Sequence, residues 1–347
     1  MGSEIWVLGA TGRTGRAVVA RLHALGTSVV PVGRDAERLA QVLPGARTVV
    51  GDLDAVLAAV GREAPAVVVN TVGPFTATAV RVARACPPGT HYVDVANELP
   101  AAQALLDLDA EAAATGRVLV CAAGFGAVAT ESVLLHLCAG RPTPARVRVD
   151  AVASVAGEAG RVGAALAGSI LGGLPDGGRR VSGGRLTRDR VGAHAERLTT
   201  PDGDVVVSGS LPSAELLAAW QGSGAAEVVA ASALVPTGAV TRLVPAAGLL
   251  FRVPGVAALA IRGLARVPVT AGDRPRPHSW AHARVEWTDG EVREGWLRAG
   301  DGMDVTAAAC AEVAVRLARG EGRPGAHTPG ALFGPELALA AGAEFVD

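Results

Sequence analysis

The sequence predicts an α/β protein whose doubly wound parallel sheet is joined to a second, α+β domain with an antiparallel or mixed sheet. In residues 5–121 short apolar runs alternate with helical segments, as happens when helices connect parallel strands. In the middle of the chain, strand-like runs cluster without regular helices between them, which favours antiparallel or mixed pairing. A chain of 347 residues is long enough for two such domains.

The first strand and helix enclose a glycine-rich turn. Residues 5–8 (Ile-Trp-Val-Leu) form an apolar run typical of a buried parallel strand, and residues 16–25 favour a helix. Between them the glycines follow the spacing G-x-x-G-x-x-G, a variant of the dinucleotide-binding pattern G-x-G-x-x-G. Such glycines permit a tight turn, close approach to a pyrophosphate and close helix packing. We therefore expect a Rossmann-type domain that binds a nicotinamide dinucleotide through Gly9, Thr11, Gly12, Arg13, Thr14 and Gly15.

The end of the second strand bears on the choice of cofactor. Residues 28–32 form this strand, and Gly33, Arg34 and Asp35 follow it. An NAD-specific site usually offers an acid here to the ribose hydroxyls, whereas a guanidinium can hold a 2′-phosphate. Arg34 therefore predicts NADPH, and Arg13 and Arg38 are placed to add to the phosphate site. The alternative is a surface arginine at a helix start, and Asp35 keeps NADH open as the cofactor.

The strand–helix alternation continues to residue 121. Strands are expected at residues 48–52, 66–70, 91–95 and 118–121, and helices at 55–60, 78–85 and 101–114. Asp52, at the end of the third strand, is placed to touch the adenine end of the cofactor. The loop after the fourth strand lies at the carboxyl edge, where open α/β sheets bind ligands. Its expected cofactor contacts are Asn70, Thr71, Val72, Gly73, Pro74 and Phe75.

The second domain is expected to begin after a helix over residues 130–136, with Thr130 as its N-cap. Strands are predicted at residues 146–152, 205–207, 228–234 and 283–287, with a hairpin turn at Asp289-Gly290 and an exposed loop at 177–184. The apolar stretch 243–269 fits two short helices, 246–251 and 256–265. Three roles are open for this stretch: a flap over an apolar substrate, an interface in a homodimer, or part of the hydrophobic core.

Several segments resemble the saccharopine dehydrogenase-like oxidoreductases, which include trans-acting enoyl reductases. They are residues 69–75, residues 89–94 with Glu98, residues 123–126, and residues 325–329 with 333–335. The resemblance covers residues 1–140 and about 280–347, and is loose between them. It implies a nicotinamide-dependent reductase of imines or carbon–carbon double bonds, with Gly124 and Phe125 bordering the nicotinamide. It also implies that a helix over residues 303–317 returns to the first domain, giving domains of 1–127 with 300–347, and of 128–299.

The candidate proton donors are Asp94 and Tyr92. All 32 basic residues are arginine and Tyr92 is the sole tyrosine, so the Tyr-x-x-x-Lys pair of short-chain dehydrogenases is absent. Asp94 ends a buried strand, where an acid needs a partner or a purpose. Tyr92 is either a donor or a packed core residue. His278 and His282 are expected on one face of a strand, and without a third ligand they predict no metal site.

Composition excludes several classes of partner. A net charge of −1 gives no electrostatic reason to expect nucleic acid or an anionic membrane. The four cysteines form no C-x-x-C pair, which favours reduced thiols and a cytoplasmic protein. No apolar run reaches the roughly 18 residues of a membrane span.

Taken with the resemblance, these features predict an NADPH-dependent reductase. It acts on a C=C or C=N bond of a small, fairly apolar metabolite, within a biosynthetic pathway. The alternatives are a non-catalytic NADP-binding regulator or scaffold, and a saccharopine-type amino-acid dehydrogenase. The last is less favoured, because the middle segment shows no dense arginine cluster for a substrate with several carboxylates.

Overall fold

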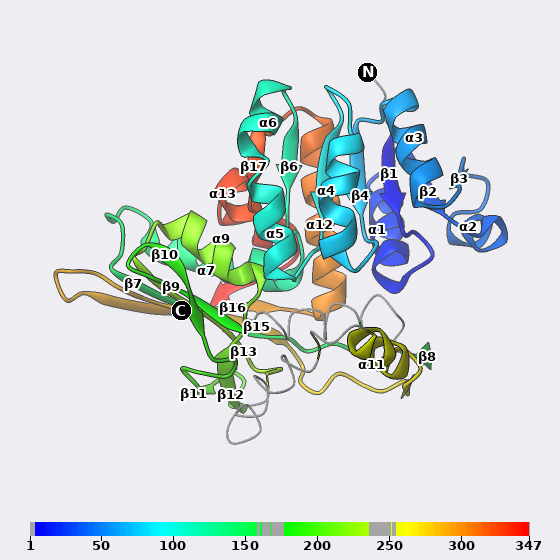
Figure 1. Ribbon diagram of the computed structural model, residues 1–347. Coiled ribbons are helices and arrows are strands. Elements are labelled where there is room, and N and C mark those ends of the chain that lie inside the picture. Colours follow the sequence, from blue (N-terminus) through cyan, green and yellow to red (C-terminus); the bar gives the residue numbers. More distant parts are fainter. Residues whose placement is uncertain are drawn as a thin grey trace.

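A computed structural model describes residues 4–157, 160–161, 167, 177–235, 251 and 255–346. It contains two large sheets, each with its own helices, and Figure 1 shows the first α/β unit lying above the second sheet. Among the described residues, none of the helices is both long enough and apolar enough to span a membrane.

The first sheet has seven strands in the order β17-β6-β5-β4-β1-β2-β3, and its neighbours pair in parallel. β1 and β4 lie at its centre and are buried along their whole length, which explains the apolar runs of residues 5–8 and 67–69. Its strands are β1 (Ile5–Leu8), β2 (Val29–Gly33), β3 (Val49–Val50), β4 (Val67–Asn70), β5 (His91–Asp94), β6 (Val118–Val120) and β17 (Gly325–His327).

Helices cover both faces of this sheet. The neighbouring helices α3, α4 and α5 pack side by side on one face, and α1 packs against α12 on the other. The single helix expected over residues 101–114 is two helices, because the chain turns at Asp107 and Leu108. The helices are α1 (Arg13–Ala24), α2 (Ala36–Val42), α3 (Leu53–Glu63), α4 (Phe75–Ala85), α5 (Leu99–Leu106), α6 (Asp109–Ala114) and α12 (Gly302–Ala318).

The second sheet has nine strands and is mixed, since β13 and β7 pair in parallel and the other pairs are antiparallel. Both sheets together confirm the predicted fold class. Two helices, α7 (Phe125–Cys138) and α9 (Ala214–Ser223), pack on one face of it. Its strands are β7 (Arg146–Val152), β9 (Gly178–Ser182), β10 (Arg185–Asp189), β11 (Glu196–Thr199), β12 (Val205–Ser210), β13 (Glu227–Ser232), β15 (Ser279–Glu286), β16 (Val292–Ala299) and β18 (Glu344–Val346).

Three expectations for the second domain need correction or limits. The loop expected at 177–184 contains β9 and the turn of the β9–β10 hairpin, with Gly183 and Gly184 both at positive φ. Thr130 does not cap a helix: α7 already begins at Phe125, and the Thr130 hydroxyl donates to the Gly126 carbonyl within it. Residues 256–265 form helix α11 (Val256–Ala265), whereas the helix expected at 246–251 falls outside the described residues.

The C-terminal segment, residues 300–346, contributes strands to both sheets. Helix α12 packs on α1, and β17 pairs with β6 in the first sheet, whereas residues 300–347 were all expected in the first domain. The last strand departs from that expectation, because β18 pairs with β16 in the second sheet. Phe345 of β18 stacks on His136 of α7, with ring centroids 4.1 Å apart. The aromatic contact and the strand pairing hold this end of the chain on the second sheet.

A buried carboxylate fastens α7 to the C-terminal segment. Glu131 of α7 accepts hydrogen bonds from the Thr328 hydroxyl (2.5 Å) and from the backbone N–H groups of Gly330 (2.6 Å) and Ala331 (2.9 Å). These groups lie at the start of the short helix α13 (Pro329–Phe333). Burial raises the pKa of Glu131 to about 7, although the three donors act to lower it.

Ionisation of Glu131 should therefore lower the stability of the folded protein as the pH rises. The folded protein holds this proton more tightly than the unfolded chain, whose glutamates titrate near ~4.3. The stabilising contribution is complete below that pH and is lost as the pH rises through about 7. Glu131→Gln removes the titration, so we expect the stability of the natural protein relative to the variant to drop by about 3 kcal/mol between pH 5 and 8. Urea unfolding at both pH values measures it, and parallel pH profiles would contradict it.

Candidate functional site

The glycine turn between β1 and α1 has room for glycine only. Gly9 has a φ of +79°, and a Cβ there would lie 2.8 Å from Thr71 Oγ1. A Cβ on Gly15 would lie 2.2 Å from the Gly9 carbonyl oxygen, so the first turn of α1 rests directly on the end of β1. Gly12 caps α1 without a side-chain hydrogen bond. The first N–H groups of α1 are thus left for an anion or for water.

The two residues after β2 have different surroundings. The Asp35 carboxylate caps α2 by accepting from the Arg38 N–H at 3.1 Å. Arg34 is exposed and makes no hydrogen bond or ion pair with any residue that the structure describes. Asp52 is likewise the N-cap of its helix, α3, and accepts from the Ala55 N–H at 2.9 Å. Both acids are thus engaged with backbone, while the Arg34 guanidinium is available for a ligand.

Further arginines gather around the glycine turn. The carbonyl of Thr11 accepts from Arg16 Nη1 at 2.9 Å and from Arg38 Nη2 at 3.4 Å. Arg13 reaches from the turn to the second domain, where its Nη2 donates to the Ala156 carbonyl at 2.9 Å. Thr14 lies against Met303 of α12, with its Oγ1 3.6 Å from the sulfur. The turn is therefore positively charged and touches both the second domain and α12.

The loop of residues 70–75 is held beside Gly9 by side chains. Asn70 Oδ1 accepts from the Val72 N–H at 3.0 Å, and Thr78 Oγ1 donates to the Val72 carbonyl at 2.6 Å. Thr71 Oγ1 donates to the carbonyl of Leu8 at the end of β1 (2.7 Å). The Phe75 N–H donates to Glu98 Oε1 at 3.2 Å. Gly73 and Pro74 complete this loop, which lies at the carboxyl ends of β1 and β4.

The two expected proton donors are buried in a polar chain. Asn70 Nδ2 donates to the Tyr92 hydroxyl (3.1 Å), which donates to Asp94 Oδ2 (2.8 Å). The other Asp94 oxygen accepts from the N–H groups of Ala96 and Ala122, at 3.0 and 2.9 Å. Neither Tyr92 nor Asp94 has exposed surface. Burial raises the pKa of Asp94 to about 6, and the pKa of Tyr92 also lies well above its usual value because of burial and the neighbouring carboxylate.

Gly124 and Phe125 lie where β6 passes into α7. The Phe125 N–H donates to Thr306 Oγ1 of α12 at 3.0 Å, and a Cβ on Gly124 would lie 3.6 Å from the methyl carbon of Thr306. This contact places the start of α7 at the same sheet edge as the loop of residues 70–75. The structure thus brings the predicted cofactor contacts of β1, β4 and β6 to one edge.

The sequence reasoning missed Glu215, which joins the two domains. This buried residue lies in the first turn of α9, and its Oε1 is 2.0 Å from where a Gly126 Cβ would be. With its amide nitrogen facing Glu215, Asn97 donates to both carboxylate oxygens, at 2.6 and 3.2 Å. Burial raises the pKa of Glu215. The Pro212-Ser213 pair before the helix was an available N-terminal signal, but nothing in the sequence indicated the contact with Gly126.

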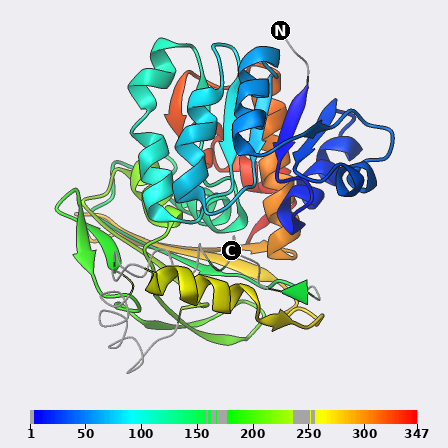
Figure 2. The same ribbon diagram turned by 45° about the vertical axis from the view of Figure 1, so that its right-hand side comes forward.

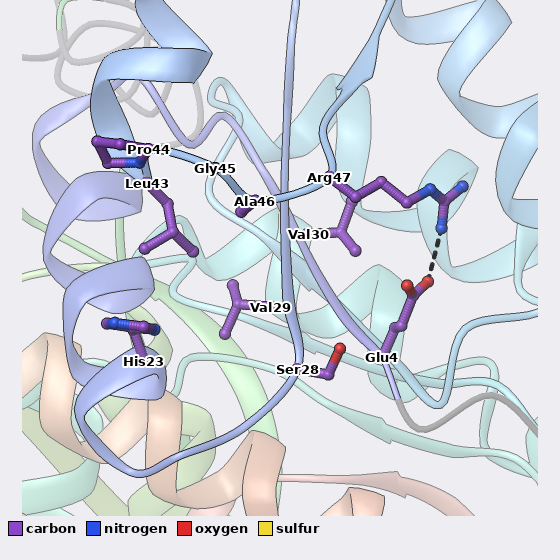
Figure 3. A pocket seen from close by; sticks show the side chains of 10 residues that line it. All are labelled: Glu4, His23, Ser28, Val29, Val30, Leu43, Pro44, Gly45, Ala46 and Arg47. Carbon is purple, nitrogen blue, oxygen red and sulfur yellow. Dashed lines mark hydrogen bonds and ion pairs between the residues drawn. The ribbon is translucent and has the colours of Figure 1, made fainter.

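A surface hollow of about 470 Å³ lies at the opposite edge of the first sheet (Figure 3). Glu4 and Ser28, which precede β1 and β2, line it together with residues 43–47. Arg47 on its rim donates to Glu4 Oε2 at 2.7 Å. Open α/β sheets bind ligands at the carboxyl ends of their strands, so this amino-end hollow is not the expected cofactor site.

His278 and His282 have separate carboxylate partners. His278 Nδ1 lies 2.9 Å from Asp202 Oδ2, and the two nitrogens of His282 lie 3.0 Å from Asp150 Oδ2 and 2.8 Å from Glu294 Oε1. Arg148 completes the second group through two hydrogen bonds to Asp150, at 2.7 and 2.9 Å. In the part of the chain that the structure describes, no three His, Cys, Asp or Glu side chains are arranged to hold a metal ion.

Comparison with known proteins assigns the fold. No family model and no curated protein matches the chain. Among solved structures, saccharopine dehydrogenase (L-Glu forming) from Saccharomyces cerevisiae matches over 100% of both chains, with a TM-score of 0.60 and 12% identity. GenD2 from gentamicin A biosynthesis, solved with NAD, covers 100% of this chain and 97% of its own, with a TM-score of 0.47 and 17% identity. A short-chain dehydrogenase from Burkholderia cenocepacia, solved with NADP, covers 35% of this chain and 70% of its own, with a TM-score of 0.31 and 18% identity. The fold is thus that of saccharopine dehydrogenase along the whole chain.

The burial of Tyr92 predicts a structural effect of Tyr92→Phe. Loss of the hydroxyl leaves a buried Asp94 oxygen without its donor, which should cost ~1–3 kcal/mol of stability. We expect a lower urea midpoint. Because Thr71 and Thr78 also hold the loop of residues 70–75, we expect less than a twofold change in the dissociation constant for a nicotinamide dinucleotide. An unchanged midpoint combined with a large loss of turnover would instead assign the hydroxyl to catalysis.

Proposed function

We propose that this chain is an NADPH-dependent reductase that acts on a C=C or C=N bond of a small metabolite. The observation that carries the proposal is the pair of residues after β2, beside a glycine turn shaped for a pyrophosphate. Arg34 is exposed without a described partner, and the Asp35 carboxylate is engaged in capping α2. A guanidinium in this place suits a 2′-phosphate, whereas an acid is needed to favour NADH.

The nicotinamide half of the cofactor is proposed to extend along the same sheet edge. The loop of residues 70–75 and the start of α7 at Gly124 and Phe125 border this path. Hydride transfer asks of the protein chiefly that it position cofactor and substrate. The shared fold with a protein named as a dehydrogenase supports a redox reaction.

Asp94 and Tyr92 are proposed to act as positioning residues. Both are fully buried, and their hydrogen bonds run to Asn70, which holds the Val72 N–H. They therefore support the loop expected to border the cofactor, and the proton in the reduction comes from another donor or from water.

The same burial favours a second candidate function, a non-catalytic protein that binds NADPH as a regulator or scaffold. Such a protein keeps the glycine turn and needs no proton donor in contact with a substrate. The two functions are separated by turnover: a reductase oxidises NADPH when enoyl or imine substrates are supplied, and a regulator only binds it. Loss of NADPH absorbance across such a substrate panel measures this difference.

The cofactor assignment predicts at least tenfold tighter binding of NADPH than of NADH, which corresponds to about 1.4 kcal/mol. Arg34→Gln should remove most of this preference by weakening NADPH binding and leaving NADH binding unchanged. Fluorescence titration of the purified protein measures both constants. Arg62→Gln, an exposed arginine in the last turn of α3, serves as the control and should bind like the natural protein. NADH binding as tight as NADPH binding would reject the role of Arg34.

A further inference from the structure

A second cavity, of about 350 Å³, lies in the second domain next to the segment that follows β7. It is lined by Ala156, Asp273, Arg274, Arg276 and Pro277. Its wall is joined to the turn by Arg13, whose Nη2 donates to the Ala156 carbonyl at 2.9 Å. The chain between α11 and β15 carries four of these residues, and Figures 1 and 2 show α11 below the first α/β unit.

The cavity carries unused hydrogen-bond donors and a net positive charge. Arg274 is exposed and makes no hydrogen bond or ion pair with a residue that the structure describes. Arg276 donates through Nη2 to the Ala153 carbonyl at 3.2 Å, but its buried Nε finds no partner among the described residues. Buried donors of this kind are normally satisfied, and leaving one unpaired is costly. Two guanidinium groups against the single Asp273 carboxylate therefore favour an anionic ligand.

The wall of this cavity is fixed by hydrogen bonds. The buried Ser154 hydroxyl donates to the Arg276 carbonyl at 2.6 Å, and the Ser154 N–H donates to Ser279 Oγ at 2.9 Å. Asp301 caps α12 with one oxygen and accepts from the Ala156 N–H with the other, at 2.8 Å each. The segment around Arg276 is thus ordered before any ligand binds, which lowers the entropic cost of binding.

We propose that Arg274 and Arg276 form a phosphate-binding site in which the second domain reaches across to the glycine turn. A guanidinium binds phosphate through two parallel N–H donors, and the N-terminus of α1 lies next to the same turn. Assigning this phosphate to the dinucleotide rests on the proposed function. The other source of the same chemistry is a phosphate of the substrate or free phosphate.

The site is tested by isothermal titration of the full-length protein with inorganic pyrophosphate and, separately, with NADPH. Arg274→Gln should raise the dissociation constant for pyrophosphate about tenfold, and Arg276→Gln should do the same. Arg274 has no described partner, so its variant keeps the test valid if Arg276→Gln fails to fold. Arg62→Gln is the matched control and should leave both constants unchanged.

The results distinguish a phosphate of the dinucleotide from a phosphate of the substrate or free phosphate. They also distinguish failure of the phosphate site from failure of the proposed function. Weaker binding of both pyrophosphate and NADPH supports the site and assigns the phosphate to the cofactor. Weaker binding of pyrophosphate alone supports the site and assigns it to a substrate or free phosphate. If NADPH fails to bind the natural protein while pyrophosphate binding still depends on Arg274, the site stands and the proposed function fails. If both arginine variants bind pyrophosphate and NADPH normally, the site is rejected and the proposed function is untouched.

Discussion

The close approach of Gly15 to the carbonyl of Gly9 is the constraint on which the candidate site depends. A single methyl group on Gly15 would lie 2.2 Å from that oxygen, so any other residue would push α1 away from β1. Because α1 stays close, its uncapped N-terminus meets the carboxyl edge of the sheet between β1 and β4. The loop of residues 70–75 and helix α12 then pack around the same turn. A small change in backbone spacing here would displace the start of α1 relative to β1 and to Thr71 and Val72.

The second domain is held to this edge by a short segment after β7. Ser154 and Ala156 bond to the start of α12, to β15 and, through Arg13, to the glycine turn itself. The bond between Ser154 and Ser279 is buried and the other two are half-buried. Breaking the buried bond would leave an unpaired polar group, which costs more than the bond contributes. The arrangement gives the two sheets a defined relative position. Residues from both domains therefore meet at the sheet edge.

Two buried carboxylates, Asp94 and Glu131, accept hydrogen bonds that join separate elements of the fold. The pKa values of Asp94 and Glu131 are raised to about 6 and about 7. Raised pKa values of this size are often found in catalytic acids. Each is fully buried and accepts three hydrogen bonds, several from backbone N–H groups. Burial raises the pKa of each carboxyl group, and the hydrogen-bond donors around it lower the pKa in part. The net shift therefore follows from the burial of the group. The raised pKa values of Asp94 and Glu131 therefore mark places where separate segments pack around a buried carboxylate.

Sequence pattern alone predicted the α/β class, the succession of strands along the chain up to β6 and the glycine turn, because these depend on local periodicity and on glycine's backbone freedom. Local pattern also indicated Arg34 at the end of β2. The three-dimensional structure was needed to show that Tyr92 and Asp94 face the interior, that β18 joins the second sheet, and that Arg276 lines a cavity together with Ala156. Such contacts join residues far apart in the chain, and their partners leave no periodic trace in the sequence.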